Sequence, residues 1–322
     1  MVKLFLAAAS LALMLASSAQ SQIVPRTELH AFLSATPTDR QFLIGAQDAP
    51  SVTLSAELRL PTAGADRLPV VVLLHASGGI NAGVVAWANE LNSAGVATLM
   101  IDSFTARKIV STVEDQDSLS RFVMILDAYR ALDLLAAHPR IDPSRIAVMG
   151  FSRGGGPAHW SAMERFRMMH AANSKARFAL HIAFYPTCNR DLKDALNVVA
   201  PIRIIHGTAD DYIPIKECRE LVTRLQAAGK DATLLEVEGA HHVFDNPAGA
   251  PVRLAQAQTT RNCPLIREAD DGALVNSVTN KAFSYASDPC VERGVTVGRN
   301  ADGLSLARKA VQTALTEAGF VR

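Results

Sequence analysis

The chain has 322 residues, of which 49% are hydrophobic and 20% are charged, and its formal net charge is +1. These values are typical of a globular protein that buries a large core, and the length suits one α/β unit with an insertion. The sequence has no basic stripe and no acidic tail, so neither nucleic acid nor a strongly charged membrane surface is expected as a partner.

The first residues have the pattern of a secretory signal. Lys3 gives a positive start, residues 4–15 form an apolar run, and the small residues before and including Ala19 suit a cleavage site. The run is shorter than the roughly 20 residues of a membrane-spanning helix, so a stable membrane anchor is the less favoured alternative. We therefore expect residues 1–19 to be a signal peptide and the protein to be exported, to the periplasm or the medium.

Residues 20–322 are predicted to form a single α/β domain with an insertion at about 248–300. Predicted strands alternate with predicted helices, which favours a mainly parallel sheet covered by helices on both faces. The predicted strands are 52–60 (an antiparallel edge strand), 69–74, 96–101, 145–149, 179–184, 202–206 and 232–237. The predicted helices are 84–94, 119–137, one from about 155, 215–228 and 304–318.

Four cysteines occur, Cys188, Cys218, Cys263 and Cys290. An even number in an exported chain favours disulfides, and four free buried thiols are the alternative. Three pairings are possible, of which the order along the chain favours Cys188 with Cys218 and Cys263 with Cys290. No two cysteines have the spacing of metal ligands, so no metal is expected.

The strongest motif is GFSRG, from Gly150 to Gly154, between an apolar strand and a segment compatible with a helix. A serine on a sharp strand-to-helix turn has a strained backbone, and the flanking glycines let the chain approach itself closely. The turn holds the hydroxyl above the sheet, and the helix N-terminus behind it favours developing negative charge. Ser152 is therefore the predicted nucleophile, and an incidental serine in a glycine-rich turn is the alternative.

A serine nucleophile needs a base, and the base needs an orienting acid. In a fold of this type they follow the serine in the order acid, then histidine. Strand 202–206 leads to Asp210 and Asp211, at the carboxyl end of a parallel strand, where such sheets bind ligands. Asp210 is the predicted acid, and Asp211 fits the lesser role of capping the helix that begins near residue 215.

Two histidines follow the last strand of the series, 232–237. From this place an imidazole can lie over the nucleophile. His242 is the predicted base and His241 a flanking residue. A structural role is the alternative for a histidine, but the place of these two in the chain order makes it less favoured.

The turn after strand 69–74 is predicted to form an oxyanion hole. A loop at this place can direct a backbone N–H at the reacting carbonyl oxygen, and the residue after the nucleophile supplies a second N–H. Ser77 is the favoured first donor, with Ala76 as the alternative, and Arg153 is the second donor.

Together these segments resemble the dienelactone hydrolase family of α/β hydrolases. The resemblance spans about residues 50–247 and rests on HASGG at 75–79, DSF at 102–104, GFSRGG at 150–155, HGTAD at 206–210 and GAHH at 239–242. It implies an α/β-hydrolase fold in which Asp210 and His242, each three residues after a glycine, are the acid and the base. Cysteines recur at positions 188 and 218 in such relatives and would lie near neighbouring strand ends, which supports their pairing.

Two features depart from this resemblance. The founding enzymes of the family use a cysteine nucleophile, whereas this chain has Ser152, which weakens the case for a dienelactone substrate. The family usually lacks the region at about 248–300, so the shape of its pocket does not carry over.

Basic side chains give a weaker indication of an acidic ligand. The side chain of Arg153 could bind a carboxylate, although a structural ion pair behind the turn is favoured. Arg107 and Lys108, after strand 96–101, are a second indication, for which a solvated loop is the favoured alternative.

These residues predict an exported serine hydrolase that cleaves a small-molecule carboxylic ester or lactone through an acyl-enzyme, with no cofactor. A peptidase or an acyltransferase with the same three residues is one alternative. A non-catalytic binding protein with this fold is another, and the absence of labelling by a fluorophosphonate would favour it.

Overall fold

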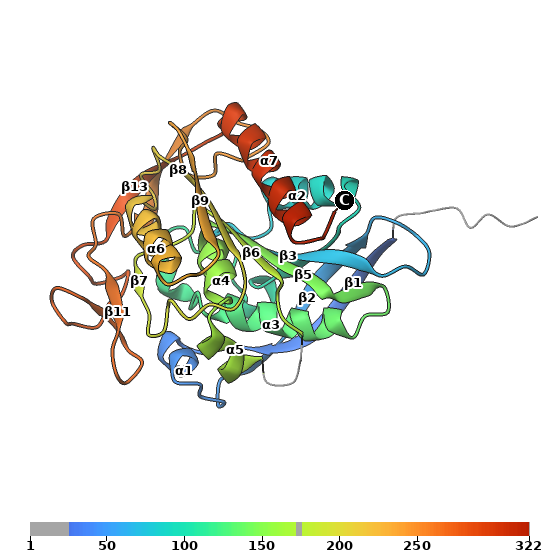
Figure 1. The fold of residues 1–322 in the computed structure, drawn as a ribbon. Helices are drawn as coiled ribbons and strands as arrows, with labels where there is room; N and C mark the ends of the chain where they lie inside the picture. Colours follow the sequence, from blue (N-terminus) through green and yellow to red (C-terminus); the bar gives the residue numbers. More distant parts are fainter. Residues whose placement is uncertain (1–25, 172–175, 322) are drawn as a thin grey trace, which may run out of the picture.

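The computed structural model describes residues 26–171 and 176–321, so the predicted signal peptide lies outside the described residues. An eight-stranded sheet with the order β1-β2-β4-β3-β5-β6-β8-β9 forms the centre (Figure 1). β2 pairs antiparallel with β1 and β4, and the other neighbours pair in parallel, which confirms the predicted mainly parallel sheet. The strands are β1 (Arg26–Ala35), β2 (Ser51–Leu60), β3 (Leu68–Leu74), β4 (Ala97–Asp102), β5 (Ile141–Phe151), β6 (Leu180–Phe184), β8 (Ile202–Gly207) and β9 (Ala232–Val237).

Helices cover both faces of this sheet. Every residue of β3 is buried, because alternate side chains pack on opposite faces: Val70 and Val72 toward α3 and α6, and Val71 and Leu73 toward α2 and α7. The continuous apolar run therefore reflects a strand enclosed on both sides. The helices are α1 (Asp39–Leu43), α2 (Ala82–Ser93), α3 (Val123–Ala136), α4 (Gly155–Trp160), α5 (Glu164–His170), α6 (Lys216–Ala227) and α7 (Ala301–Glu317), with short 3-10 turns η1 (Thr105–Arg107), η2 (Gln116–Ser118) and η3 (Ser152–Gly154).

The prediction that β2 is an edge strand is wrong, because β1 pairs along its whole length. The side chains of β1 have an inverted pattern: Leu29 and Leu33 on its outer side are 83% and 64% exposed, whereas Glu28 and His30 on the inner side are partly buried. Only Phe32 and Ser34 on the inner side are buried. Exposed leucines outside and mostly polar residues inside conceal a strand from an analysis of alternation.

The helix predicted from residue 119 begins four residues later than expected. Residues 119–122 precede α3, and the carbonyl of Leu119 accepts a hydrogen bond from Nη2 of Arg153. The backbone of Leu119 is extended, with a φ of −151° and a ψ of 132°, so the helix does not begin at this residue.

Residues 248–300, the predicted insertion, form short strands rather than irregular chain. β10 (Val252–Thr259) pairs with β13 (Glu292–Val297), and β11 (Ile266–Glu268) pairs with both β12 (Leu274–Asn276) and β7 (Arg190–Asp191). The predicted disulfides are present: Cys263 bonds to Cys290 within this region, and Cys188 bonds to Cys218 at the start of α6.

An ion pair buried beneath the loop after β4 joins Arg107 to Asp127 of α3. Nη2 of Arg107 is 2.8 Å from Oδ1 of Asp127, and the two side chains are 3% and 0% exposed. The hydroxyls of Ser34 and Ser103 also donate to this carboxylate, at 2.6 and 2.8 Å. The alternative of a solvated loop is therefore wrong for Arg107, and its guanidinium is occupied within the fold.

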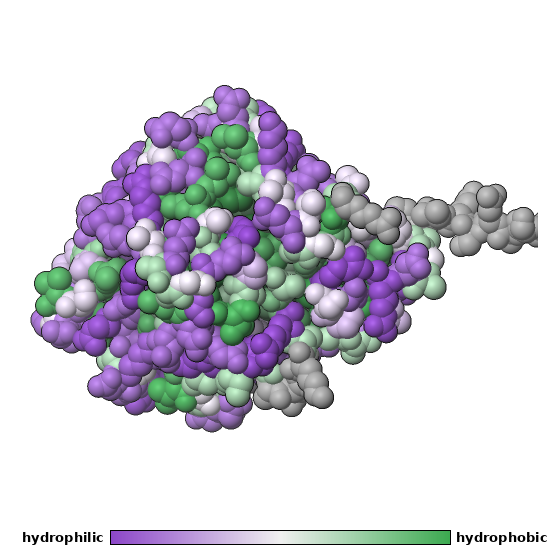
Figure 2. Space-filling model, viewed as in Figure 1, coloured by the Kyte–Doolittle hydropathy of each residue, from purple (hydrophilic) through white to green (hydrophobic). Residues whose placement is uncertain are grey.

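The face drawn in Figure 2 has hydrophilic side chains over most of its area, with a hydrophobic area beside α7. Among the described residues, no helix is both long and apolar enough to cross a membrane.

The Asp127→Ala substitution is expected to lower the free energy of unfolding by about 3–5 kcal/mol, because it leaves the buried guanidinium of Arg107 without its anion. Urea denaturation measures the change. Glu90→Ala is the matched control, since the pair between Glu90 and Arg308 is 47% exposed on both sides and should contribute less than about 1 kcal/mol. Equal small losses in both variants would contradict the assigned role of the buried pair.

Candidate active site

The turn that follows β5 places Ser152 at the carboxyl edge of the sheet. Ser152 has a φ of +52°, in the left-handed region that side chains rarely adopt. A Cβ at Gly150 would overlap the backbone of Gly154, and a Cβ at Gly154 would overlap the carbonyls of Leu74 and His75. Glycine is therefore required at both positions for the strand to turn directly into α4.

The loops after β8 and β9 bring Asp210 and His242 to this serine. Nε2 of His242 is 2.7 Å from Oγ of Ser152, and Nδ1 of His242 is 2.6 Å from Oδ2 of Asp210. When Nδ1–H donates to the carboxylate, Nε2 is free to accept the proton of the hydroxyl. The three residues selected from the sequence thus lie in one hydrogen-bonded chain.

The surroundings of Asp210 keep it ionised. The N–H groups of Tyr212 and Ile213 both donate to Oδ1, each at 2.9 Å, and Nε2 of His206 lies 3.2 Å from Oδ2. Burial alone would raise the pKa of Asp210, but His242 and His206 outweigh burial and hold the pKa well below its ordinary value. A carboxylate that stays ionised can orient an imidazole and stabilise its charged form.

Two tyrosines that sequence analysis missed enclose His242. The ring centroids of Tyr185 and Tyr212 lie 4.6 and 4.7 Å from that of His242. The hydroxyl of Tyr185 donates to Asp245 at 2.6 Å, and the indole N–H of Trp87 donates to the same carboxylate at 2.7 Å. Burial raises the pKa of both Tyr185 and Asp245. The place of Tyr185 directly after a buried strand was the one signal that could have identified it.

The turn after β3 lies against the start of α4. Ala76 pairs with Gly79 as an isolated bridge, so Ser77 lies in the tight turn between them. The N–H groups of Ser77 and Arg153 make no hydrogen bond within residues 26–171 and 176–321. Both N–H groups are therefore available to an oxygen atom of a ligand, as an oxyanion hole requires.

The side chain of Arg153 turns into the protein, away from Ser152. It is 1% exposed, and its Nη1 donates to Oε1 of Gln116 at 2.9 Å, while Nη2 donates to the carbonyl of Leu119. It forms no ion pair with any residue that the structure describes, so the predicted structural ion pair is wrong. A buried guanidinium with only uncharged partners is unusual, because burying a charge is costly unless it is paired.

The competing acid and histidine have other contacts. Nδ1 of His241 lies 2.9 Å from the carbonyl oxygen of Ala209. The carboxylate of Asp211 accepts a hydrogen bond from the N–H of Thr296 at 2.7 Å, and no side chain caps α6. The predicted capping role of Asp211 is therefore wrong, since this residue holds β13 instead.

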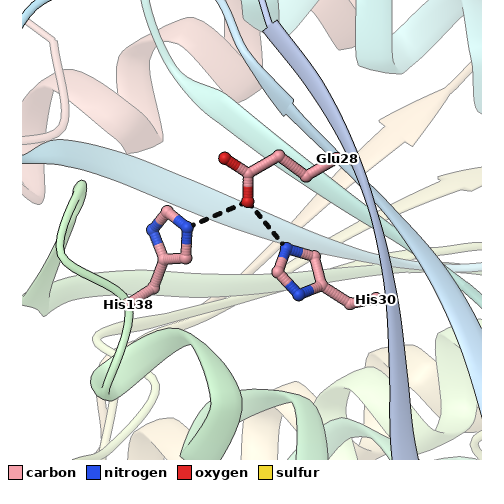
Figure 3. A group of neighbouring side chains, drawn as sticks. All are labelled: Glu28, His30 and His138. Carbon is pink, nitrogen blue, oxygen red and sulfur yellow. Dashed lines mark hydrogen bonds and ion pairs between the residues drawn. The ribbon is translucent and has the colours of Figure 1, made fainter.

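A possible metal-binding group lies at the other end of the sheet, at Glu28, His30 and His138 (Figure 3). Both imidazoles point to Oε2 of Glu28, with Nε2 distances of 2.9 Å for His30 and 3.1 Å for His138. The N–H of Arg140 donates to Nδ1 of His138, so a neutral His138 ring carries its proton on Nε2, toward the carboxylate. The carboxylate of Glu28 thus joins the two imidazoles.

A comparison with protein families identifies the family of the chain. A model of the dienelactone hydrolase family matches residues 54–263, more than half of the chain. The chain belongs to the dienelactone hydrolase family. The matched range includes Ser77, Ser152, Asp210 and His242 and most of the strands of the large sheet. This membership places the chain among hydrolases that act on ester bonds.

Two curated proteins are similar in sequence to this family member. A probable 2-oxo-3-(5-oxofuran-2-ylidene)propanoate lactonase of Bradyrhizobium sp. is 28% identical over 219 residues, which cover 62% of this chain and 83% of the lactonase. The uncharacterized peptidase YuxL of Bacillus subtilis (strain 168) is 27% identical over 141 residues, which cover 36% of this chain and 21% of the peptidase. The chain thus spans about a fifth of the length of the peptidase.

Solved structures confirm the fold. A dienelactone hydrolase-like promiscuous phosphotriesterase from metagenomic libraries has a TM-score of 0.56 at 17% identity, covering 91% of this chain and 98% of its own. Esterase 2 of Thermogutta terrifontis, phosphorylated by paraoxon, has a TM-score of 0.55 at 18% identity, and the match covers 83% of this chain and 90% of the esterase. The predicted α/β-hydrolase fold is therefore correct.

The position of Asp210 predicts a dependence of stability on pH. Because its pKa is lower in the folded than in the unfolded chain, the ionised group stabilises the fold above about pH 4, and this contribution is lost as the pH falls further. Asp210→Asn is expected to flatten the dependence of the unfolding free energy on pH between about 5 and 3. Urea denaturation at several pH values measures it.

Asp211→Asn is the matched control, since Asp211 lies outside the contacts with the two histidines. An unchanged slope in Asp210→Asn, together with a flattened slope in Asp211→Asn, would reverse the assignment of the two acids.

Proposed function

We propose that the chain is an exported serine hydrolase that cleaves a carboxylic ester or lactone through an acyl-enzyme. The observation that carries the proposal is the continuous hydrogen-bonded chain from Ser152 through His242 to Asp210, with distances of 2.7 and 2.6 Å. A serine hydroxyl becomes an effective nucleophile when an oriented base accepts its proton.

The reaction follows from the proton positions. Oγ of Ser152 attacks the acyl carbon while Nε2 of His242 accepts the hydroxyl proton, and Asp210 stabilises the imidazolium. His242 then donates that proton to the leaving alcohol, which for a lactone stays attached to the acyl group. A water molecule, deprotonated by His242, attacks the acyl carbon. The bond from this carbon to Oγ of Ser152 breaks, His242 returns the proton to Oγ, and the acid is released.

Negative charge develops on the carbonyl oxygen in the transition state, and this oxygen needs hydrogen-bond donors beside it. The N–H groups of Ser77 and Arg153 fit this role, since neither donates elsewhere in the described ranges, 26–171 and 176–321. One such donor contributes about 3–4 kcal/mol to stabilising the transition state. The hydroxyl of Ser77 accepts a hydrogen bond from Gln116 at 3.3 Å, which helps to fix the turn.

Relatives guide the choice of bond. The similar protein named a probable lactonase is matched over 83% of its length, whereas the one named a peptidase is matched over 21%. The family and these coverages favour an ester or lactone over an amide. A panel of 4-nitrophenyl esters, small lactones and peptide anilides separates the alternatives, and hydrolysis of anilides alone would favour a peptidase.

Ser152→Ala is expected to reduce the hydrolysis of 4-nitrophenyl acetate by at least about 10³-fold and to abolish labelling by a fluorophosphonate. His242→Ala should reduce turnover similarly, whereas the matched control His241→Ala should retain most of it. Circular dichroism checks that each variant is folded. Full activity in folded Ser152→Ala would refute the serine mechanism, and an unlabelled, inactive native protein would favour a binding function.

The proposed export is open to a separate test. The two disulfides support an oxidising compartment. Expressed in a Gram-negative host, the protein is expected in the periplasm or medium with Gln20 as its first residue, as N-terminal sequencing would show. A variant lacking residues 4–15 should stay inside the cell. Recovery of the native chain from the cell interior with its N-terminal segment intact would contradict export.

A further inference from the structure

A cavity of about 460 Å³ lies beside the active site, between α1, the segment before α3, β7 and residues 273–285. Ser152, Asp210 and His242 are not among its lining residues. Two of the elements that border it, α1 and β7, are labelled on the same side of the molecule in Figure 1. Its walls come partly from residues 248–300, the predicted insertion, so it is a feature of this chain rather than of the matched family region alone.

Several guanidinium groups gather at this cavity. Arg40, Arg121 and Arg190 line it, and Arg40 pairs with Asp271. Arg121 and Arg190 both contact Tyr285: Cζ of Arg121 is 4.8 Å from the ring centroid, and Nη2 of Arg190 is 3.4 Å from the hydroxyl. The side chain of Arg153 lies behind the wall, where Gln116 accepts hydrogen bonds from Arg153 and Arg121 at 2.9 and 2.8 Å. One side of the cavity is therefore densely cationic.

These positive charges lack matching negative charges. Arg121, Arg153 and Arg190 form no ion pair within residues 26–171 and 176–321, and Nε of both Arg121 and Arg153 is buried without a hydrogen-bond partner. Two carboxylates line the cavity. That of Asp117 accepts from the hydroxyl of Ser284 and the N–H of Ala286, and that of Asp39 influences the arginines only from beyond ion-pair distance. Buried charges of one sign are costly unless an opposite charge compensates them.

The electrostatic consequences are visible in neighbouring groups. Burial, together with the nearby charge of Arg121, lowers the pKa of Arg153 to about 9, and burial also lowers the pKa of Arg190. Burial alone would raise the pKa of Tyr285, but Arg121 and Arg190 outweigh it and lower that pKa. A cavity with such a positive field favours an anion.

We propose that this cavity binds a small organic carboxylate, whose oxygens lie between the guanidiniums of Arg121 and Arg190. Guanidinium groups match the two oxygens of a carboxylate, which would also supply the missing charge. Besides the arginines, the walls carry large apolar groups, Phe122, Trp160 and Phe283. They suit a ligand with an apolar body better than a bare inorganic ion.

Gln116 connects the cavity to the active site. Its Oε1 binds Arg121 and Arg153, while its Nε2 donates to Oγ of Ser77 at 3.3 Å and to the hydroxyl of Tyr212 at 3.1 Å. The carboxylate is therefore either the acidic end of a substrate that reaches Ser152 or a separate acid. Both sources use the same contacts, and kinetics distinguishes them.

Binding is tested with benzoate as the probe and benzamide as its uncharged control, by calorimetry and thermal shift on the mature protein. Benzoate is expected to bind native protein and Ser152→Ala equally, and Arg121→Gln and Arg190→Gln should each weaken binding by at least about 10-fold. Without benzoate, Arg190→Gln should unfold at the same or a higher temperature than native protein, because it removes an uncompensated charge. A purely structural arginine would give the opposite shift.

Arg308→Gln is the matched control, since Arg308 is half-exposed and distant in the fold. Arg121→Lys keeps the positive charge but loses the planar set of donors that matches a carboxylate. It replaces Arg121→Gln in the test if that variant does not fold. The proposal is overturned if benzoate does not bind, if both arginine variants bind it as native protein does, or if benzamide or phosphate binds as tightly. Ser152→Ala separates these failures from any failure of the proposed catalysis.

Kinetics then identifies the source of the carboxylate. If the site holds the acidic end of the substrate, Arg121→Gln and Arg190→Gln lower kcat/KM for the mono-4-nitrophenyl ester of glutaric acid by about 10-fold or more and leave 4-nitrophenyl acetate nearly unchanged. If a separate acid binds, kcat/KM changes by the same factor for both esters, while the arginine variants still weaken the binding of benzoate. Either result supports the site.

Discussion

The turn at Ser152 is the constraint on which the rest of the site depends. Its left-handed backbone, at a φ of +52°, is held because Gly150 and Gly154 let β5, α4 and the end of β3 approach one another without side chains between them. Backbone strain of this kind persists only when the surrounding structure fixes it. The same contact brings the turn that contains Ser77 against the start of α4, so the proposed nucleophile and the two proposed oxyanion donors are placed by one packing arrangement.

This turn also determines where the side chain of Arg153 goes. Its N–H faces the proposed oxyanion site while its guanidinium turns inward to Gln116 and Leu119. These contacts hold the segment before α3. The earlier part of the same loop is held by the pair between Arg107 and Asp127. Two buried arginines thus organise the chain between β4 and α3, one with a carboxylate and one without.

The parts of the structure that depend on local pattern could be predicted from the sequence. The enclosed strands, the GFSRG turn and the order of acid and histidine gave the α/β-hydrolase fold, and they gave Ser152, Asp210 and His242, which the structure brings together. Features that depend on distant contacts could not be predicted. β1 has Leu29 and Leu33 outside, and Asp211 binds Thr296 from β13. Gln116 gains its importance from contacts with Ser77, Arg153 and Tyr212, which are far away in sequence.

Residues 248–300 contact the proposed active site directly and through its neighbours. The N–H of Gly298 donates to the carbonyl of His242 at 3.0 Å. The hydroxyl of Thr259 donates to the carbonyl of Tyr212 at 2.6 Å, and Oε1 of Gln258 accepts from the N–H of Gln116 at 2.8 Å. Tyr212 both packs on His242 and donates its N–H to Asp210, so the position of β10 is transmitted directly to the acid and the base. β10 holds both the loop of Asp210 and Gln116, which lies between the active site and the arginine-lined cavity. A sequence change in β10 would therefore alter the surroundings of His242 and of Arg121 and Arg153 together. The geometry of the proposed active site therefore depends on residues 248–300 as well as on the turn from Gly150 to Gly154. A comparison of relatives needs to include both segments.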